Sequence, residues 1–183
     1  YHGLSSFGKQ TTRVATSRDG VEFACLEPEL ERTYLRAFEH DEMWYAMAMP
    51  GVFYRSKDGL GGFEQGPQLF PNTMRHSALL KRENTLHVFW SRVGDTPEHI
   101  LMSTIDVAQD WQQWQASDPV SVMSPEQGYE GADQPLVASV RDAINIRVNQ
   151  LRDPAIFEED GRTYLFYSIA GEAGIAGAEL EFD

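Results

Sequence analysis

Apolar and polar positions alternate along this chain in short runs, and the runs recur. Residues 75–91 (RHSALLKRENTLHVFWS) match residues 152–168 (RDPAIFEEDGRTYLFYS) without a gap. Residues 34–48 (YLRAFEHDEMWYAMA) fit both with one residue deleted in the turn. Each stretch reads as a short apolar strand, a polar turn and an aromatic-rich strand, which is the pattern of a β-hairpin. The recurrence predicts a repeated antiparallel unit.

A second recurring pattern follows each hairpin. Residues 13–23 resemble residues 53–63, because both contain a strand, an Asp-Gly turn and an aromatic residue that opens another strand. Residues 100–104, followed by two tryptophans, give a longer version of this pattern, and residues 174–180 give its first strand alone. Each complete unit then holds four antiparallel strands in about 40 residues, which is typical of a propeller blade.

We therefore expect an all-β chain that forms a single, incomplete β-propeller domain over residues 1–183. The predicted units are half a blade (about 1–30), two full blades (about 33–70 and 74–122) and a three-stranded blade (about 151–183). These make about three and a half blades, whereas a closed propeller needs at least four. Either further sequence or a second copy would complete the ring. An antiparallel sandwich is the alternative, and helix is confined to a turn or two within residues 107–115.

Composition and charge narrow the class of protein and of partner. Hydrophobic residues make up 42% of the chain and charged residues 23%, which is ordinary for a soluble globular protein. The net charge of −13 argues against a nucleic-acid or membrane surface, because both require basic patches. The first residues lack the apolar segment of a signal peptide, and no apolar run approaches the roughly 20 residues of a membrane span. The compartment stays unknown.

The single cysteine limits the chemistry that the chain can carry. Cys25 stands alone, so a disulfide framework and a cysteine-based zinc site within one chain are excluded. No set of residues shows the spacing of a metal site, and we expect no cofactor.

Blade topology sorts the charged residues between the two ends of the strands. Successive strands run antiparallel and the first strand is innermost, so the starts of the inner strands share one end with the turns between second and third strands. Charged residues predicted in the other turns lie at the far end, where they are turn and surface residues: Asp19, Asp58, Glu83, Asp160 and the cluster His40, Asp41 and Glu42.

The near end collects a different set of residues. The inner-strand starts contribute Arg36, Arg75, His76, Arg152 and Asp153, and the turns contribute Asp95, Glu98, His99 and Glu172. The long connection over residues 124–150 joins them, and loops of that length are often functional. Its amides, carboxylates and guanidinium groups suit hydrogen bonding to a polyhydroxyl ligand.

The repeat resembles the blade motif of five-bladed β-propeller glycosidases, the superfamily of glycoside hydrolase families 43 and 32. Those blades open with Asp-Pro or Arg-Asp-Pro, as residues 152–154 do, and their outer strands carry a Ser-x-Asp-Gly pattern like SRDGVEF and SKDGLGGF. The resemblance implies a site in the funnel where the inner strands begin. Three carboxylates act there, because glycoside cleavage needs a protonated acid and an ionised carboxylate across the sugar ring. Some members hold a calcium ion in the central channel.

Only some of the family's site residues have counterparts in this sequence. Asp153 matches the acid of the Arg-Asp-Pro motif, which implies an orienting or stabilising role. Glu130 resembles the acid of a Glu-Gly-Pro motif, although here it reads Glu-Gly-Ala and lies in the loop. Arg152, Arg75, His76, Glu172 and Arg36 are the expected substrate-binding residues. The fructosidase signature is absent, and the blade that usually supplies the base would precede residue 1.

The leading hypothesis is a carbohydrate-active, glycoside hydrolase-like propeller that acts on or binds a plant- or algal-type oligo- or polysaccharide. It would be an enzyme only with the complete ring, and a homo-oligomer is one way to complete or cover that ring. A non-catalytic sugar-binding or scaffolding propeller is the first alternative. A sialidase-like propeller is the second, because Arg36, Arg75 and Arg152 at successive strand starts resemble an arginine cluster for a substrate carboxylate.

Overall fold

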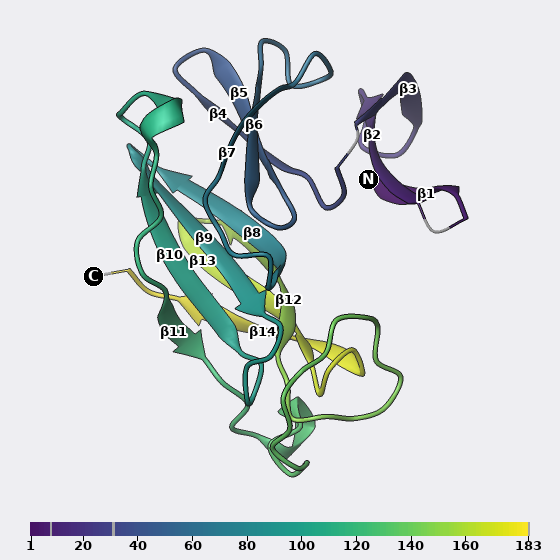
Figure 1. Cartoon of the computed structure of the whole chain (residues 1–183), viewed down its shortest axis with the longest axis vertical. Helices are drawn as coiled ribbons and strands as arrows, with labels where there is room; N and C mark the ends of the chain where they lie inside the picture. The colour runs from purple at the N-terminus through teal and green to yellow at the C-terminus, as the bar shows by residue number, and fades with distance from the viewer. Residues whose placement is uncertain (8, 31, 183) are drawn as a thin grey trace. The chain divides into compact units, whose positions relative to one another are not determined.

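The chain is all-β in this computed structural model, which describes residues 1–7, 9–30 and 32–182 (Figure 1). The strands form four separate antiparallel sheets, and helix within the described ranges is limited to the short turns η1 (Trp111–Gln113) and η2 (Gly128–Glu130). No helix among these residues is long and apolar enough to cross a membrane. The chain divides into two compact units, Tyr1–Phe70 and Pro71–Asp183, which are described in turn.

The first unit contains two sheets whose strands follow one another in sequence order. One is formed by β1 (His2–Ser6), β2 (Lys9–Ser17) and β3 (Phe23–Leu30), and the other by β4 (Arg36–His40), β5 (Met43–Ala48), β6 (Val52–Ser56) and β7 (Glu64–Gln68). The first sheet therefore has three strands where half a blade was predicted. Strand β1, with the sequence HGLSS, has too few apolar residues to show a strand period of two.

Equivalent Asp-Gly turns join β2 to β3 and β6 to β7. Asp19 Oδ1 accepts hydrogen bonds from Val21 N and Glu22 N, both at 2.9 Å. Asp58 Oδ1 accepts in the same way from the two backbone amides that follow its own turn, at 2.9 and 3.1 Å. Both carboxylates thus close a turn through their own side chains, which is the role that the sequence predicts for them.

The second unit also contains two sheets. Its four-stranded sheet has the order β11-β10-β9-β8, from β8 (Met74–Arg82), β9 (Thr85–Arg92), β10 (Ile100–Asp106) and β11 (Val120–Met123). Its three-stranded sheet has the order β12-β13-β14, from β12 (Arg152–Glu159), β13 (Arg162–Ile169) and β14 (Gly174–Leu180). The turns begin at Glu83 and Asp160, whose positive φ angles of 50° and 51° fit the predicted hairpin turns.

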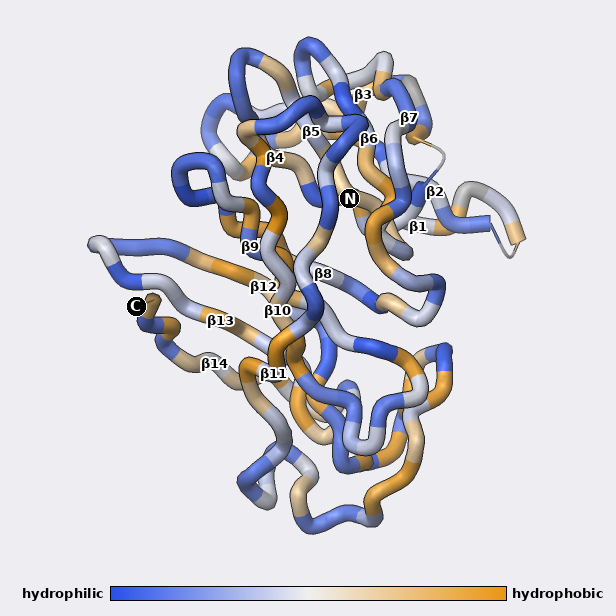
Figure 2. Tube along the Cα trace, turned by 60° about the vertical axis from the view of Figure 1, so that its left-hand side comes forward, coloured by the Kyte–Doolittle hydropathy of each residue, from blue (hydrophilic) through white to orange (hydrophobic). Residues whose placement is uncertain are grey.

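The core of the second unit lies between its two sheets. Ala78, Leu80, Phe89 and Ile100 of the four-stranded sheet form one buried cluster with Leu151, Leu165 and Tyr167 from the three-stranded sheet and the residue before it. Figure 2 shows the hydrophobic positions running along these strands and along parts of the connection between β11 and β12. Strands β8 and β12 are in contact, so the inner strands of neighbouring sheets lie side by side.

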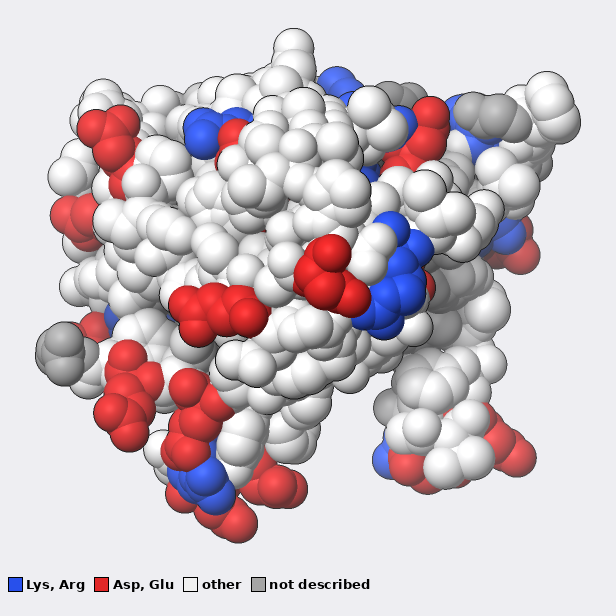
Figure 3. All heavy atoms as spheres, turned by 90° about the horizontal axis from the view of Figure 1, so that it is seen from below, with Lys and Arg blue, Asp and Glu red and all other residues white. Residues whose placement is uncertain are grey.

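The four sheets have three, four, four and three strands. A sandwich would gather its strands into two large sheets, so four small meanders match the blade prediction and not the sandwich alternative. The chain holds four blades, and the predicted five-bladed type is not confirmed by this count. Acidic and basic side chains are both scattered over the face shown in Figure 3, and the whole chain has a net charge of −13.

Candidate functional site

The inner strands of the second unit begin with the same irregularity. The register of β8 on β9 shifts between Met74 and Ser77, and the register of β12 on β13 shifts between Arg152 and Ala155. Such bulges are frequent next to active sites, because they redirect side chains out of the regular ladder. Asp153 also has a φ of 50°, a left-handed conformation that is uncommon for any residue other than glycine. The local geometry therefore marks these two strand starts.

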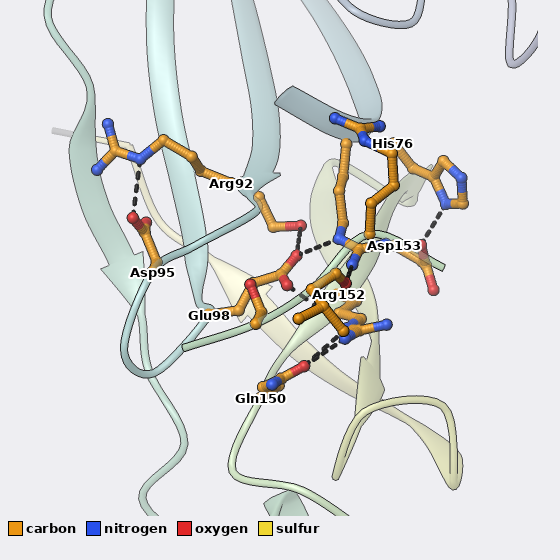
Figure 4. A network of polar contacts seen from close by, with 12 residues as sticks. His76, Arg92, Asp95, Glu98, Gln150, Arg152 and Asp153 are labelled. Atoms are coloured by element: carbon orange, nitrogen blue, oxygen red, sulfur yellow. Dashed lines mark hydrogen bonds and ion pairs between the residues drawn. The ribbon is translucent and has the colours of Figure 1, made fainter. Parts of the chain in front are cut away.

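His76 and Asp153 lie at equivalent positions of the repeat and contact each other directly. Figure 4 shows the two side chains pointing toward one another, with His76 Nδ1 bonded to Asp153 Oδ1. Ser168 Oγ donates a hydrogen bond to Asp153 Oδ2 at 3.0 Å. The His76 side chain is 26% exposed and that of Asp153 is 30% exposed, so a ligand can reach both.

Asp153 is ionised at neutral pH. Burial opposes its ionisation, but the hydrogen bond and charge of His76, together with Ser168 and Arg152, outweigh burial and hold the pKa of Asp153 below its usual value. The pair is therefore a carboxylate bonded to an imidazole, a group that can orient a polar ligand or exchange a proton with it.

Acid should remove the stability that Asp153 contributes. A group with a depressed folded-state pKa stabilises the protein above its unfolded-state pKa, about 3.9 for Asp, and loses that effect as the pH falls through the folded-state value. Denaturant unfolding from pH 7 to pH 2 should show native protein more stable than Asp153→Asn at neutral pH, with the difference closing at acid pH. A difference that stays constant down to pH 2 would contradict this assignment.

A buried ion network lies directly behind the pair. Arg75, Arg152 and Glu98 are 7%, 0% and 0% exposed. Glu98 Oε1 lies 2.9 Å from Arg75 Nε and Glu98 Oε2 lies 3.5 Å from Arg152 Nε, and Ser91 Oγ donates a 2.7 Å hydrogen bond to Oε1 (Figure 4). The Arg75 contact is an ion pair without hydrogen-bond alignment. One carboxylate is thus shared by two guanidinium groups inside the protein.

The guanidinium group of Arg152 also donates hydrogen bonds to three neighbouring residues. Its Nε donates to Gln150 Oε1 at 3.0 Å, and its Nη1 donates to Asp142 O at 3.3 Å and to Glu172 Oε1 at 3.1 Å. Its guanidinium group is therefore buried and bound to protein acceptors, whereas the sequence predicts a ligand-binding role for it. Glu172, whose side chain is 35% exposed, keeps one edge toward solvent.

Arg75 holds the long loop instead of a ligand. Its Nη2 donates to the carbonyl oxygen of Val140, in the middle of the loop over residues 124–150. The neighbouring Ser139 accepts a hydrogen bond from Gly94 N at 2.9 Å through its side chain. Both contacts fix the loop to the end of the sheets where β8 and β12 begin. Arg75 therefore also differs from its prediction, because it is buried and bound to protein atoms.

Glu130 occupies an enclosed position in the same loop. It is 4% exposed, and its carboxylate accepts hydrogen bonds from Glu126 N, Gln127 N and Tyr167 Oη, each at 2.9 Å. Burial alone would raise its pKa, but the three hydrogen bonds hold the pKa of Glu130 below its usual value. A general acid needs a raised pKa, so this arrangement favours a structural role over the catalytic role that the resemblance implied.

Two further predicted residues have partners close by in the sequence. Arg36 begins β4 in the first unit, where it is exposed and donates to Leu35 O at 3.4 Å. Asp95 accepts from Arg92 Nε at 2.9 Å, within its own turn. Within the described ranges, no three His, Cys, Asp or Glu side chains are grouped as they would be around a metal ion.

Sequence reasoning missed the serines that support the site. Ser168 binds Asp153 and Ser91 binds Glu98. The two are the equivalent last residues of the matched stretches RDPAIFEEDGRTYLFYS and RHSALLKRENTLHVFWS, so the repeat itself contained the signal. Each serine is a polar residue at the end of an aromatic-rich strand, and it lies opposite the charged start of the inner strand. This pattern identifies both serines.

Comparison with known proteins relates the chain to a viral protein and to solved glycosidases. No family model matches the sequence. The chain is 37% identical over 184 residues to the uncharacterized protein R118 of Acanthamoeba polyphaga mimivirus, an alignment that covers 91% of this chain and 52% of the relative. It thus spans about half the length of the curated relative that it matches.

Solved structures identify the fold. A thermostable family-43 glycoside hydrolase matches all of this chain and 67% of its own, with a TM-score of 0.63 and 13% identity. Bacteroides ovatus GH43B, from a xyloglucan utilisation locus, gives a TM-score of 0.52 at 16% identity over 82% of this chain and 28% of its own. The α-L-arabinanase of Cellvibrio cellulosa gives 0.51 at 17% identity over 81% of this chain and 47% of its own. The chain therefore has the β-propeller fold of these glycosidases.

Proposed function

We propose that the chain is part of a carbohydrate-active propeller of the glycoside hydrolase family 43 type, and that it binds a neutral oligo- or polysaccharide of the plant or algal kind. The binding groups are the imidazole of His76 and the carboxylate of Asp153. In the whole protein, the ring would be of the five-bladed type, completed by further sequence or by a second copy. The partner is a sugar, and neither nucleic acid nor a membrane.

One observation supports this proposal above the others. Two bulged inner-strand starts bring His76 and Asp153 together, both partly exposed, with Asp153 in a left-handed conformation. A carboxylate and an imidazole side by side can accept and donate hydrogen bonds to adjacent sugar hydroxyl groups.

The same geometry favours sugar binding without cleavage for this chain. Glycoside hydrolysis uses two carboxyl groups across the bond. Among the described residues of the second unit, Glu130 is enclosed and Glu172 is ion-paired with Arg152, which leaves Asp153 as the candidate acid at the site. Hydrolysis would need carboxylates from the remainder of a longer protein. A sialidase-like function is disfavoured, because the Arg75 and Arg152 guanidinium groups are enclosed and bound to protein atoms.

Calorimetric titration of the 183-residue chain with arabino-, xylo- and fructo-oligosaccharides tests the proposal. We expect binding of at least one of these neutral sugars, no release of reducing ends, and a loss of about 10- to 100-fold in affinity for Asp153→Asn, the range for a hydrogen bond to a charged group.

Asp160→Asn is the matched control. Asp160 has a φ of 51° like Asp153, but it lies in the turn between β12 and β13, at the other end of the strand. Asparagine tolerates this conformation, so sugar affinity should not change. Failure of all three neutral sugars to bind at millimolar concentration, or equal weakening by both variants, would reject the site.

A further inference from the structure

We infer that Glu98 is a positioning residue, which fixes the distance between His76 and Asp153 by clamping the two strand starts from behind. Its carboxylate is fully buried and lies between guanidinium groups from different sheets, with Arg75 on β8 and Arg152 on β12. In the part of the chain that the structure describes, no other buried carboxylate is paired with two arginines.

The clamp acts at the residues directly before the pair. Arg75 precedes His76 and Arg152 precedes Asp153 in the sequence; the two arginine side chains contact Glu98, whereas the side chains of the residues that follow them contact each other (Figure 4). Each arginine therefore goes inward to Glu98, while the next residue goes outward to the site. The bulges give these starts freedom that a regular ladder would remove, so an anchor behind them is needed to define where the outward side chains stand.

The main chain of Glu98 reinforces the same connection. Glu98 O accepts a hydrogen bond from Leu151 N at 2.9 Å, and Glu98 forms an isolated parallel bridge with Gln150. Gln150 in turn accepts from Arg152 through its side chain. The residue before β12 and the first residue of β12 are thus both tied to the turn that carries Glu98. A shift of this turn would move Asp153 relative to His76.

The role of Glu98 in sugar binding rests on the proposed function, but its effect on the distance between His76 and Asp153 can be tested without any sugar. The test is the coupling between His76 and Asp153, measured by a double-mutant cycle of His76→Ala and Asp153→Ala in the whole chain. Denaturant unfolding is followed by tryptophan fluorescence in a Trp44→Phe background, which leaves Trp90, Trp111 and Trp114, all in the second unit. In the native background we expect a coupling of roughly tenfold in the unfolding equilibrium constant.

The cycle is then repeated in three backgrounds. In Glu98→Gln, which removes the buried charge, the coupling should fall below about twofold. Ser91→Ala removes the hydroxyl that donates to Glu98 and is the milder variant if Glu98→Gln does not fold; it should reduce the coupling as well. Leu80→Ala destabilises the core between the same sheets and should leave the coupling unchanged.

These outcomes separate positioning from support of the fold alone. A merely structural Glu98 would lower stability in its own background and leave the coupling near tenfold, as Leu80→Ala does. Persistence of the coupling in the foldable Glu98 or Ser91 variant overturns the inference, and so does its absence from the native protein. If the coupling behaves as expected and no neutral sugar binds, the proposed function fails and the positioning role stands.

Discussion

Replacing Glu98 with leucine is expected to lower the free energy of unfolding by about 3–5 kcal/mol, the range for breaking a buried ion pair by removing one partner. The leucine would leave the Arg75 and Arg152 guanidinium groups buried without their shared carboxylate. Glu172 cannot replace it, because its side chain is partly in solvent and contacts Arg152 alone. Burial of an uncompensated charge is the physical reason for so large an effect.

Denaturant unfolding at pH 7 measures this loss. Glu158→Leu provides the control, because Glu158 is half-exposed and its 3.3 Å contact with Arg82 lies at the surface of the same unit. Surface substitutions of this kind usually change stability by about 0.5 kcal/mol or less. A Glu98→Leu protein as stable as Glu158→Leu would show that the buried network contributes nothing beyond what apolar packing supplies.

The hairpins of the second unit were predictable because their sequences repeat. The matched stretches 75–91 and 152–168 became β8–β9 and β12–β13, with turns at the predicted residues. The alternation of apolar and polar residues and the choice of turn residues are local features of the sequence, so they can be recognised without knowledge of the tertiary structure. Strand β1 carries neither signal, and the first sheet was therefore assigned fewer strands than it has.

Arg75 and Arg152 lie at the starts of β8 and β12, but the direction of their side chains was not predictable from the sequence. A bulge inserts an extra residue, and this reverses which side chains face inward. Arg75 and Arg152 consequently point into the protein, where Glu98 neutralises them. Only the coordinates of neighbouring sheets show that two arginines share one carboxylate, since the three residues come from separate segments of the chain.

The loop glutamate illustrates how a motif without its structural context misleads. Glu130 resembles a catalytic acid by its Glu-Gly sequence, yet the turn η2 folds the carboxylate back onto its own loop, where it caps Glu126 N and Gln127 N. This capping is a local interaction within one turn of backbone. Its sequence signal is the spacing of Gln127 and Glu130, which are three residues apart.

Replacing Glu130 with alanine should destabilise the protein by about 3 kcal/mol, because several buried donors then lose a charged acceptor. The hydroxyl of Tyr167 would be one of them, and burial and Glu130 raise the pKa of Tyr167, so this phenol remains a donor that requires a partner. Glu126→Ala is the control: its side chain is exposed and its backbone amide survives the change, so its effect should stay within about 0.5 kcal/mol.

Glutamine at position 130 distinguishes the structural role from a catalytic one. Its amide oxygen can still accept from the two backbone amides, and the loss is then limited to the acceptor of the Tyr167 hydroxyl, so Glu130→Gln should cost about 1–2 kcal/mol, less than Glu130→Ala. Sugar affinity should be unchanged in this variant. A catalytic acid would give the reverse pattern, in which glutamine preserves stability and abolishes hydrolysis by the longer protein. Retained hydrolysis in Glu130→Gln would therefore place the proton donor elsewhere, and lost hydrolysis at full stability would restore Glu130 to the catalytic group.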